Sequence, residues 1–319
     1  MLYSLLKSYA RLAIRIYCAR IRINRPEVLS SGGPLLIAAN HPNSFLDGII
    51  LTTLFDNQVY SLARGDAFQH PVINRLLRRL RLLPVYRTSE GVHNLGHNYT
   101  TFDACHRTFR NNGIVLIFSE GRCENEWHLR PLKKGTARLA TTAWQNSIPL
   151  RVLPLGINYS SFKKFGKEVH LNFGTAITSS ALDPEATDGR QLVHFNEMLQ
   201  QQLQDLVYEI EDGDRQSRAK RFNLAKDTLF YMMLIPAVAG IVLHLPFFLI
   251  CKVFTELNFK RSGHYDSVQT SLLMVFYPVY WILVTVLFGI WSWVAGIAAF
   301  LLLPLLARAA VVVKVKAGL

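Results

Sequence analysis

The 319-residue sequence is short of charge, of cysteine and of nucleotide-binding motifs. Only 18% of its residues are charged, unlike the uniformly polar, basic chains that wrap nucleic acid. Its four cysteines follow no paired or metal-binding spacing, so we expect reduced thiols and no metal site. Neither G-x-x-x-x-G-K-[ST] nor G-x-G-x-x-G occurs, which excludes a nucleotide-binding loop of either type.

Charge is scarcest in the C-terminal part of the chain. Residues 228–319 contain two acidic and six basic side chains, against 20 and 29 in residues 1–227. Residues 229–251 carry no formal charge, and about 20 apolar residues cross a bilayer as a helix. Residues 271–307 are also uncharged and are too long for one span, so they predict a hairpin or a kinked element. Its candidate break points are Pro278, Gly289, Gly296 and Pro304.

The N-terminus predicts a different kind of membrane contact. Lys7, Arg11 and Arg15 recur every four residues and interrupt any apolar run, so we expect neither a spanning helix nor a signal-peptide core. A basic amphipathic helix of this kind either lies in a membrane interface or packs on the domain core. The arginine-rich residues 72–83 leave a similar choice between anionic lipid headgroups and a solvated face.

Short apolar runs alternate with helical patterns between residues 20 and 210. The runs that predict strands are residues 20–25, 35–39, 59–63, 114–118, 152–156 and 169–173. The patterns that predict helices are residues 45–55, 72–83, 139–145 and 192–210. This alternation predicts an α/β fold, a parallel or mixed sheet with flanking helices, followed by a C-terminal α-helical transmembrane region.

The first candidate site is the segment NHPNSFLD, residues 40–47, which follows the second predicted strand. A histidine at the carboxyl end of a strand, with a carboxylate close behind it, suits general-base catalysis. On an unbroken helix His41 and Asp47 would lie ~240° apart, but Pro42 favours an extended conformation at His41. The alternative is that Ser44 and Asp47 form a helix-capping box and that His41 is an ordinary turn residue.

The second candidate site is FSEGR, residues 118–122, directly after the most apolar predicted strand. Open α/β sheets place ligands at the ends of such strands. Glu120, Gly121 and Arg122 offer a carboxylate, close backbone approach and a guanidinium that suits phosphate. The alternative is an ordinary strand exit with solvated charges. Ser119 is not expected to be a nucleophile, because no G-x-S-x-G motif surrounds it.

The order of four blocks carries a resemblance to a known family. NHPNSFLDG, then RGDAF with LPVYR, then FSEGR, then IPLRVLPLG resembles the glycerolipid acyltransferases, which include glycerol-3-phosphate and lysophosphatidate acyltransferases. The resemblance covers roughly residues 35–157. It implies that His41 deprotonates the acceptor hydroxyl and that Asp47 orients it. The implied substrate-binding residues are Arg87 for the acceptor phosphate, Glu120, Gly121 and Arg122 for the glycerol phosphate, and Pro154 for the acyl-donor side.

Two features depart from the family's pattern. Five residues separate His41 from Asp47, where the family usually has four. In the third block Ser119 stands where proline is usual, and the basic residue Arg122 comes one place early. The resemblance divides the chain into an interfacial helix with a lead-in strand (1–25), an acyltransferase domain (26–212), a charged linker (213–227) and a transmembrane region (228–319).

The implied function is that of a membrane-bound O-acyltransferase of phospholipid biosynthesis. Acyl-CoA or acyl carrier protein would donate a fatty acyl group to a glycerol phosphate or lysophospholipid, with no other cofactor and no metal. The alternative is a non-catalytic lipid-binding membrane protein with a degenerate domain; a lipid hydrolase lacks its motif. Basic residues in the linker favour a cytoplasmic catalytic domain in an integral membrane protein. The other loops of the tail are equally basic, so two or three spans remain open, and lipid phosphate rather than nucleic acid is the expected partner.

Overall fold

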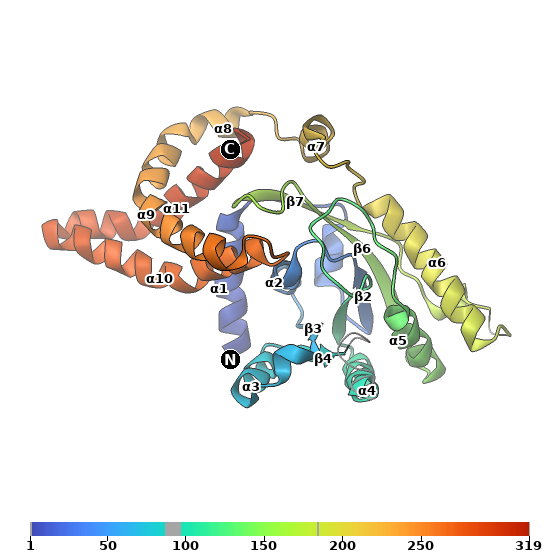
Figure 1. Ribbon diagram of the computed structural model, residues 1–319. Helices are drawn as coiled ribbons and strands as arrows, with labels where there is room; N and C mark the ends of the chain where they lie inside the picture. The colour runs from blue at the N-terminus through green and yellow to red at the C-terminus, as the bar shows by residue number, and fades with distance from the viewer. Residues whose placement is uncertain (1, 87–96, 184, 319) are drawn as a thin grey trace.

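The computed structural model describes residues 2–86, 97–183 and 185–318 (Figure 1). Within these residues, seven strands form one mixed sheet in the order β1-β7-β6-β2-β5-β3-β4. Neighbouring strands are parallel except β6 and β7, which are antiparallel. The strands are β1 (Cys18–Ile23), β2 (Leu35–Ala39), β3 (Val59–Arg64), β4 (Leu82–Val85), β5 (Ile114–Phe118), β6 (Arg151–Tyr159) and β7 (Lys167–Phe173). The predicted α/β class is confirmed.

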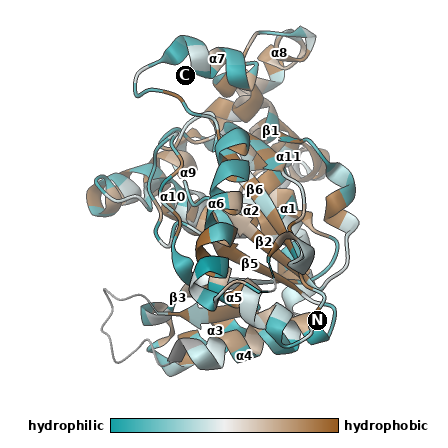
Figure 2. Cartoon of the chain, turned by 90° about the vertical axis from the view of Figure 1, so that its right-hand side faces the viewer, coloured by the Kyte–Doolittle hydropathy of each residue, from teal (hydrophilic) through white to brown (hydrophobic). Residues whose placement is uncertain are grey.

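Helices cover both faces of the sheet, and the alternation of side chains along β2 shows how. Leu35 and Ile37 face one apolar cluster, which contains residues of α1 and α2, while Leu36 and Ala38 face another, which contains residues of α4, α5 and α6. Figure 2 shows the hydrophobic strands β2 and β5 behind the largely hydrophilic outer face of α6. The helices are α1 (Leu2–Tyr17), α2 (Ser44–Leu54), α3 (Pro71–Arg79), α4 (His97–Arg110), α5 (Lys134–Gln145) and α6 (Asp188–Leu206), with 3-10 turns at Pro26–Ser30, Gly65–Phe68 and Ser179–Ala181.

The helix predicted over residues 72–83 is too long at its C-terminal end. Helix α3 ends at Arg79, and Leu82–Val85 form strand β4. Arg81 has a φ of 64°, a left-handed conformation that does not continue a helix. The apolar residues after it then pair with β3, where Leu83 lies opposite Leu62. The helix predicted over 192–210 also ends early, at Leu206, and it begins before its predicted start, at Asp188.

The C-terminal part of the chain is helical throughout. Its helices are α7 (Arg215–Phe222), α8 (Thr228–Met232), α9 (Leu234–Phe259), α10 (Tyr265–Trp291) and α11 (Trp293–Lys316). Among the described residues, α9, α10 and α11 are long and apolar enough to cross a membrane. The segment expected to be a charged linker, residues 213–227, contains the short helix α7. Phe222 of this helix is fully buried and packs beside His170 of β7.

The second uncharged run is a hairpin, but it breaks at none of the expected residues. The chain turns at Ser292, between α10 and α11, and Pro278 and Pro304 lie inside the helices. Gly289 and Gly296 instead let the two helices touch. A Cβ atom added to Gly296 would lie 2.8 Å from the Cα atom of Gly289, so only glycine fits this close approach.

Helix α9 follows a different course from the α10–α11 hairpin. Near its start, Ala237 is buried in a cluster with Ala309 and Val313, close to the end of α11. In its middle, Phe247 stacks on Tyr280 of α10 with ring centroids 4.7 Å apart. Its C-terminal end leads into the start of α10, which contacts α2 of the α/β domain. Both ends of α9 therefore lie on the side of the domain, whereas the hairpin extends away from it (Figure 1).

Candidate active site

The two predicted sites meet at the carboxyl edge of the sheet. Strands β2 and β5 are parallel, and Ala39 lies opposite Phe118 at their ends. The backbone N–H of His41 donates a hydrogen bond of 2.7 Å to Oε2 of Glu120. The His41 ring stacks on the ring of Phe118, with centroids 3.8 Å apart and planes 9° apart. The sheet thus brings NHPNSFLD and FSEGR together.

Glu120 fixes the backbone of the site rather than lying open to solvent. It is buried, and while Oε2 accepts the N–H of His41, Oε1 accepts the N–H of Arg130 at 3.0 Å. Burial raises the pKa of Glu120, and the two backbone N–H groups oppose that rise. Because both carboxylate oxygens already have backbone partners, Glu120 holds two loops at a fixed distance.

His41 and Asp47 form a hydrogen-bonded pair. Nδ1 of His41 lies 2.9 Å from Oδ2 of Asp47, whose side chain is fully buried. The same oxygen accepts the N–H of Asn43 at 2.9 Å, and Oδ1 accepts the hydroxyl of Tyr159 at 2.6 Å. Asp47 therefore acts both as a partner of the helix start and as the partner of the imidazole. The capping box expected between Ser44 and Asp47 does not form, because the N-cap residue is Asn43 and Oγ of Ser44 lies 2.5 Å from Nδ1 of His264 instead.

The five-residue spacing does not separate the pair. Ser44, the first residue of α2, has a φ of 52°. This left-handed conformation turns the chain sharply. The segment can therefore contain the fifth residue between His41 and Asp47 while the two side chains remain in contact. The N–H of Ser44 is held by Sγ of Cys123 at 2.8 Å. Burial raises the pKa of the Cys123 thiol to about 12, so the thiol stays protonated at neutral pH.

This arrangement selects one tautomer of the imidazole. A carboxylate accepts hydrogen bonds only, so Asp47 holds the proton on Nδ1 and leaves the lone pair on Nε2. The His41 side chain is 14% exposed, whereas that of Asp47 is 0% exposed. A fixed, partly accessible imidazole backed by a buried carboxylate is suited to take a proton from a hydroxyl.

The third block presents a glycine and an exposed guanidinium beside this pair. Gly121 has a φ of 72°, and a Cβ atom there would lie 2.9 Å from Cγ of Lys133, so the turn requires glycine. The Arg122 side chain is 56% exposed, with Nε 3.3 Å from Oε1 of Glu124. Arg122 is therefore a surface cation held by one exposed partner.

Of the remaining two predicted residues, the structure describes one, Pro154, and does not bring it to His41. Arg87 lies outside the described residues. Pro154 lies in the interior of β6, opposite Ala38, and its carbonyl accepts the N–H of Gly174 at 2.9 Å. These contacts give Pro154 a place inside the sheet rather than at the strand ends. Ser119 is buried, and its Oγ accepts a hydrogen bond from Thr136, so it is not presented as a nucleophile.

A buried polar cluster lies behind Asp47, and sequence reasoning missed it. Oδ2 of Asp266, in the first turn of α10, accepts hydrogen bonds from Tyr17, Asn43 and Lys167 at 2.7, 2.7 and 2.6 Å. Asp266 is one of only two acidic residues after residue 227. That rarity was the available signal, because a lone carboxylate beside an apolar run marks a functional position by default.

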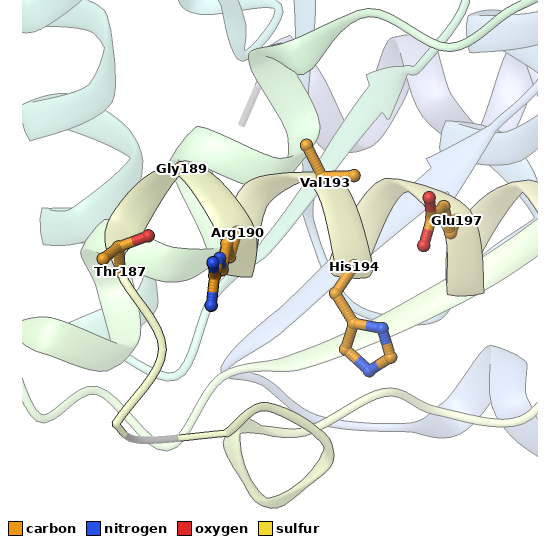
Figure 3. Close-up of a pocket in the computed structure, with 6 residues that line it drawn as sticks. All are labelled: Thr187, Gly189, Arg190, Val193, His194 and Glu197. Carbon is orange, nitrogen blue, oxygen red and sulfur yellow. The ribbon is translucent and has the colours of Figure 1, made fainter.

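The hollow that the structure shows most clearly lies away from the pair. The hollow drawn in Figure 3 lies along the first turns of α6, lined by Arg190, His194 and Glu197 among others, and contains none of the residues around His41. Within the described ranges, no three histidine, cysteine, aspartate or glutamate side chains gather as a possible metal site.

The fold and the pair define an α/β protein with an imidazole–carboxylate couple at the end of a parallel strand. Residues 20–158 match the family model described as Acyltransferase. This match covers less than half of the chain but contains all four blocks, so the predicted resemblance to an acyltransferase family is confirmed for these residues. A similar solved structure is the 1-acyl-sn-glycerophosphate (LPA) acyltransferase PlsC from Thermotoga maritima, with 14% identity, coverage of 63% of this chain and 77% of that chain, and a TM-score of 0.46. No curated protein matches the chain.

Proposed function

We propose that the protein is a membrane-bound glycerolipid O-acyltransferase. It transfers a fatty acyl group from a thioester, acyl-CoA or acyl carrier protein, to a hydroxyl of a glycerol phosphate or lysophospholipid in phospholipid biosynthesis. The observation that carries the proposal is the pair of His41 and Asp47, 2.9 Å apart, at the end of β2 inside the acyltransferase-family domain. A family member without catalytic function has no need of a histidine held in one tautomer by a fully buried carboxylate.

The pair supports direct transfer without an acyl-enzyme. Nε2 of His41 takes the proton of the acceptor hydroxyl as its oxygen attacks the thioester carbonyl carbon. The tetrahedral intermediate then expels the thiolate, and the C–S bond breaks as the C–O ester bond is completed. The imidazolium returns its proton to the thiolate, which leaves as the free thiol. Asp47 stabilises the imidazolium between these two steps and does not take the proton itself.

The third block supports an anionic acceptor. Arg122 lies two residues after Glu120, whose carboxylate holds the backbone of His41, so its guanidinium belongs to the same edge of the sheet. An exposed guanidinium binds phosphate oxygens through paired N–H donors. A phosphate bound there would hold a neighbouring hydroxyl at the edge that carries His41.

The helices support a domain on the cytoplasmic face of the membrane. Both ends of α9 and the end of α11 lie on the domain side, so the basic residues at these points share one side. They are Lys226 before α9, Lys260 and Arg261 between α9 and α10, and Lys314 and Lys316 in the last turn of α11. Basic loops stay in the cytoplasm, so this grouping favours a cytoplasmic domain.

An orientation test uses two introduced cysteines. In intact cells, a membrane-impermeant maleimide should label Ser292→Cys at the tip of the hairpin and should not label Gly263→Cys beside the domain. Permeabilised cells provide the control in which Gly263→Cys becomes labelled. Labelling of Gly263→Cys alone in intact cells would reverse the proposed orientation.

The activity test is an acceptor panel. Membranes that contain the wild-type protein are given labelled acyl-CoA or acyl carrier protein, with glycerol 3-phosphate, dihydroxyacetone phosphate, lysophosphatidate or other lysophospholipids. We expect labelled ester with at least one phosphate-bearing acceptor. In His41→Ala, general-base loss should lower that rate by about 10²–10⁴-fold. No product with any acceptor, or a wild-type rate for folded His41→Ala, would contradict the proposal.

A further inference from the structure

We propose that Asp266, in the first turn of the membrane helix α10, is a positioning residue for the pair of His41 and Asp47. The helix that anchors the protein thereby also completes its active site. This inference rests on the proposed acyltransferase function. It goes beyond that function because it assigns an activity-determining role to the membrane region, outside residues 20–158 that match the family.

The start of α10 is joined to the catalytic loop by polar contacts. Ser267 Oγ donates to the carbonyl of Asn43 at 2.8 Å and accepts the N–H of Leu46 at 3.2 Å. Nδ1 of His264 lies 2.5 Å from Oγ of Ser44. Asn43, Ser44 and Leu46 are thus held by the N-terminal end of α10, which lies more than 200 residues later in the chain.

Asp266 reaches Asp47 through two routes. In the first, its Oδ2 accepts from the side-chain amide of Asn43, whose backbone N–H donates to Oδ2 of Asp47. In the second, Oδ2 of Asp266 accepts from Nζ of Lys167, which lies 5.5 Å from the ring centroid of Tyr159. The hydroxyl of Tyr159 donates to Oδ1 of Asp47. Each oxygen of Asp47 is therefore held by a group that contacts Asp266 or its partner.

A contribution to stability alone does not explain the buried ion pair of Asp266 and Lys167. Asp266 is 1% exposed and Lys167 is 0% exposed. Removing two charges from water costs as much as their attraction returns, so apolar residues of similar volume often stabilise a fold equally well. Burial lowers the pKa of Lys167, and the carboxylates of Asp266 and Asp47 oppose that change. The pair places a compensated positive charge close to the carboxylate that holds His41.

Several other titratable or charged groups face this network. Those on the catalytic edge are Asp47, Glu120 and Cys123; those behind it are Tyr17, Cys18, Tyr159, Lys167 and Arg308, whose guanidinium donates to the Cys18 carbonyl. Apart from Asp266, the carboxylates of this set are Asp47 and Glu120. Loss of the Asp266 charge therefore leaves the ammonium of Lys167 without its only direct carboxylate partner among the described residues.

The test compares the pH dependence of kcat in Asp266→Asn and in the double variant Asp266→Asn/Lys167→Met. In Asp266→Asn, an uncompensated ammonium near Asp47 disfavours protonation of His41. The acid limb of the profile should then move to lower pH by about half to one unit, and kcat should fall about tenfold. The double variant removes both charges, so its acid limb should return toward that of the wild type. Glu256→Gln, which removes an exposed carboxylate paired with Lys252 on α9, is the matched control and should change neither quantity.

Circular dichroism and thermal melting establish that each variant is folded before kcat is measured per folded enzyme. If the contacts of Asp266 serve stability alone, both variants lose melting temperature while kcat and the acid limb stay at wild-type values, and the proposal is overturned. The same holds if the double variant shifts as far as the single one. Failure of the proposed function looks different, because the wild-type protein itself then transfers no acyl group.

Discussion

The two sides of the His41 imidazole are built differently. Behind it, Asp47 is fully buried, and its oxygens are bonded to Asn43 and Tyr159 as well as to the imidazole. On the proposed acceptor side, Arg122 is 56% exposed and touches one exposed carboxylate. Groups fixed in a buried site stabilise a transition state without reorganising, whereas exposed charges act through a screened attraction. In the proposed mechanism the base is thus preorganised, and the acceptor side is adaptable.

This difference separates two kinds of effect. A change behind the imidazole alters the base itself and should lower kcat. A change in front alters the attraction of an anionic acceptor and should raise KM. Variants on the two sides therefore test whether the sides are as distinct in function as they are in structure.

The largest effect is expected from Asp47→Asn. An amide does not hold the Nδ1 proton as a carboxylate does, and it leaves the imidazolium without a counter-charge. We expect kcat to fall by about 10²–10⁴-fold with little change in KM for the acceptor. Steady-state kinetics measures both. The control is Asp56→Asn, an exposed aspartate just after α2 whose carboxylate accepts the hydroxyl of Ser30. An effect confined to KM would place Asp47 on the acceptor side.

Glu120→Gln should have the next largest effect. The carboxylate accepts N–H groups of His41 and Arg130 on separate oxygens, whereas an amide accepts on one side only. One buried N–H then loses its partner, the His41 backbone shifts, and kcat should fall about tenfold. Glu126→Gln, which removes an ion pair with the Arg130 side chain, controls for general disturbance of this loop. Equal kinetics for the two variants would contradict the positioning role.

Glu120→Gln should also change how the melting temperature depends on pH. Burial raises the pKa of Glu120 in the folded protein. A carboxyl group of this kind stabilises the folded state fully below its unfolded pKa, about 4.3, and this stabilisation is lost as pH rises through the folded pKa. The melting temperature of the wild type should therefore decline relative to that of Glu120→Gln as pH rises above about 4.3. Parallel melting curves across this window would contradict the prediction.

The contacts behind the imidazole differ in how far the sequence predicts them. His41 and Asp47 are six residues apart, so local rules for proline and helix starts allowed them to meet, and the resemblance implied that they do. Tyr159 bonds Asp47 across 112 residues, and Asp266 bonds Asn43 across 223. Such contacts depend on sheet order and on the docking of α10. Periodicity along the chain does not encode either of these.

The fold shows the same limit. Short apolar runs predicted the strands of the sheet other than β4, because central strands such as β2 and β5 bury both faces between helix layers. The same rules missed β4, because its apolar residues extend the helical pattern of α3 in the sequence. In the structure, the left-handed Arg81 ends the helical path before β4 begins. They also placed the hairpin break at glycine or proline, whereas the glycines serve the close packing of two helices.

Tyr159→Phe should have a smaller effect than the carboxylate variants. It removes one hydrogen bond to Asp47 and keeps the ring that lies over Lys167. Since Asp47 retains the partners on its other oxygen, we expect kcat to fall about three- to tenfold, the value of roughly one hydrogen bond. Tyr208→Phe, which removes a hydroxyl that bonds His170 on another part of β7, is the control. A loss as large as that of Asp47→Asn would mean that the hydroxyl does more than support the carboxylate.

The smallest effect is expected from Arg122→Gln, on the open side. KM for a phosphate-bearing acceptor should rise about three- to tenfold while kcat stays near the wild-type value, because an exposed charge contributes on the order of 1 kcal/mol. The difference should shrink between 0.05 and about 0.5 M salt, since the Debye length falls below about 10 Å. An acceptor without a phosphate group provides the matched control and should show no change. A fall in kcat that salt does not diminish would show that Arg122 acts in the transition state, and the two sides of the imidazole would then no longer divide into a fixed base and an adaptable acceptor site.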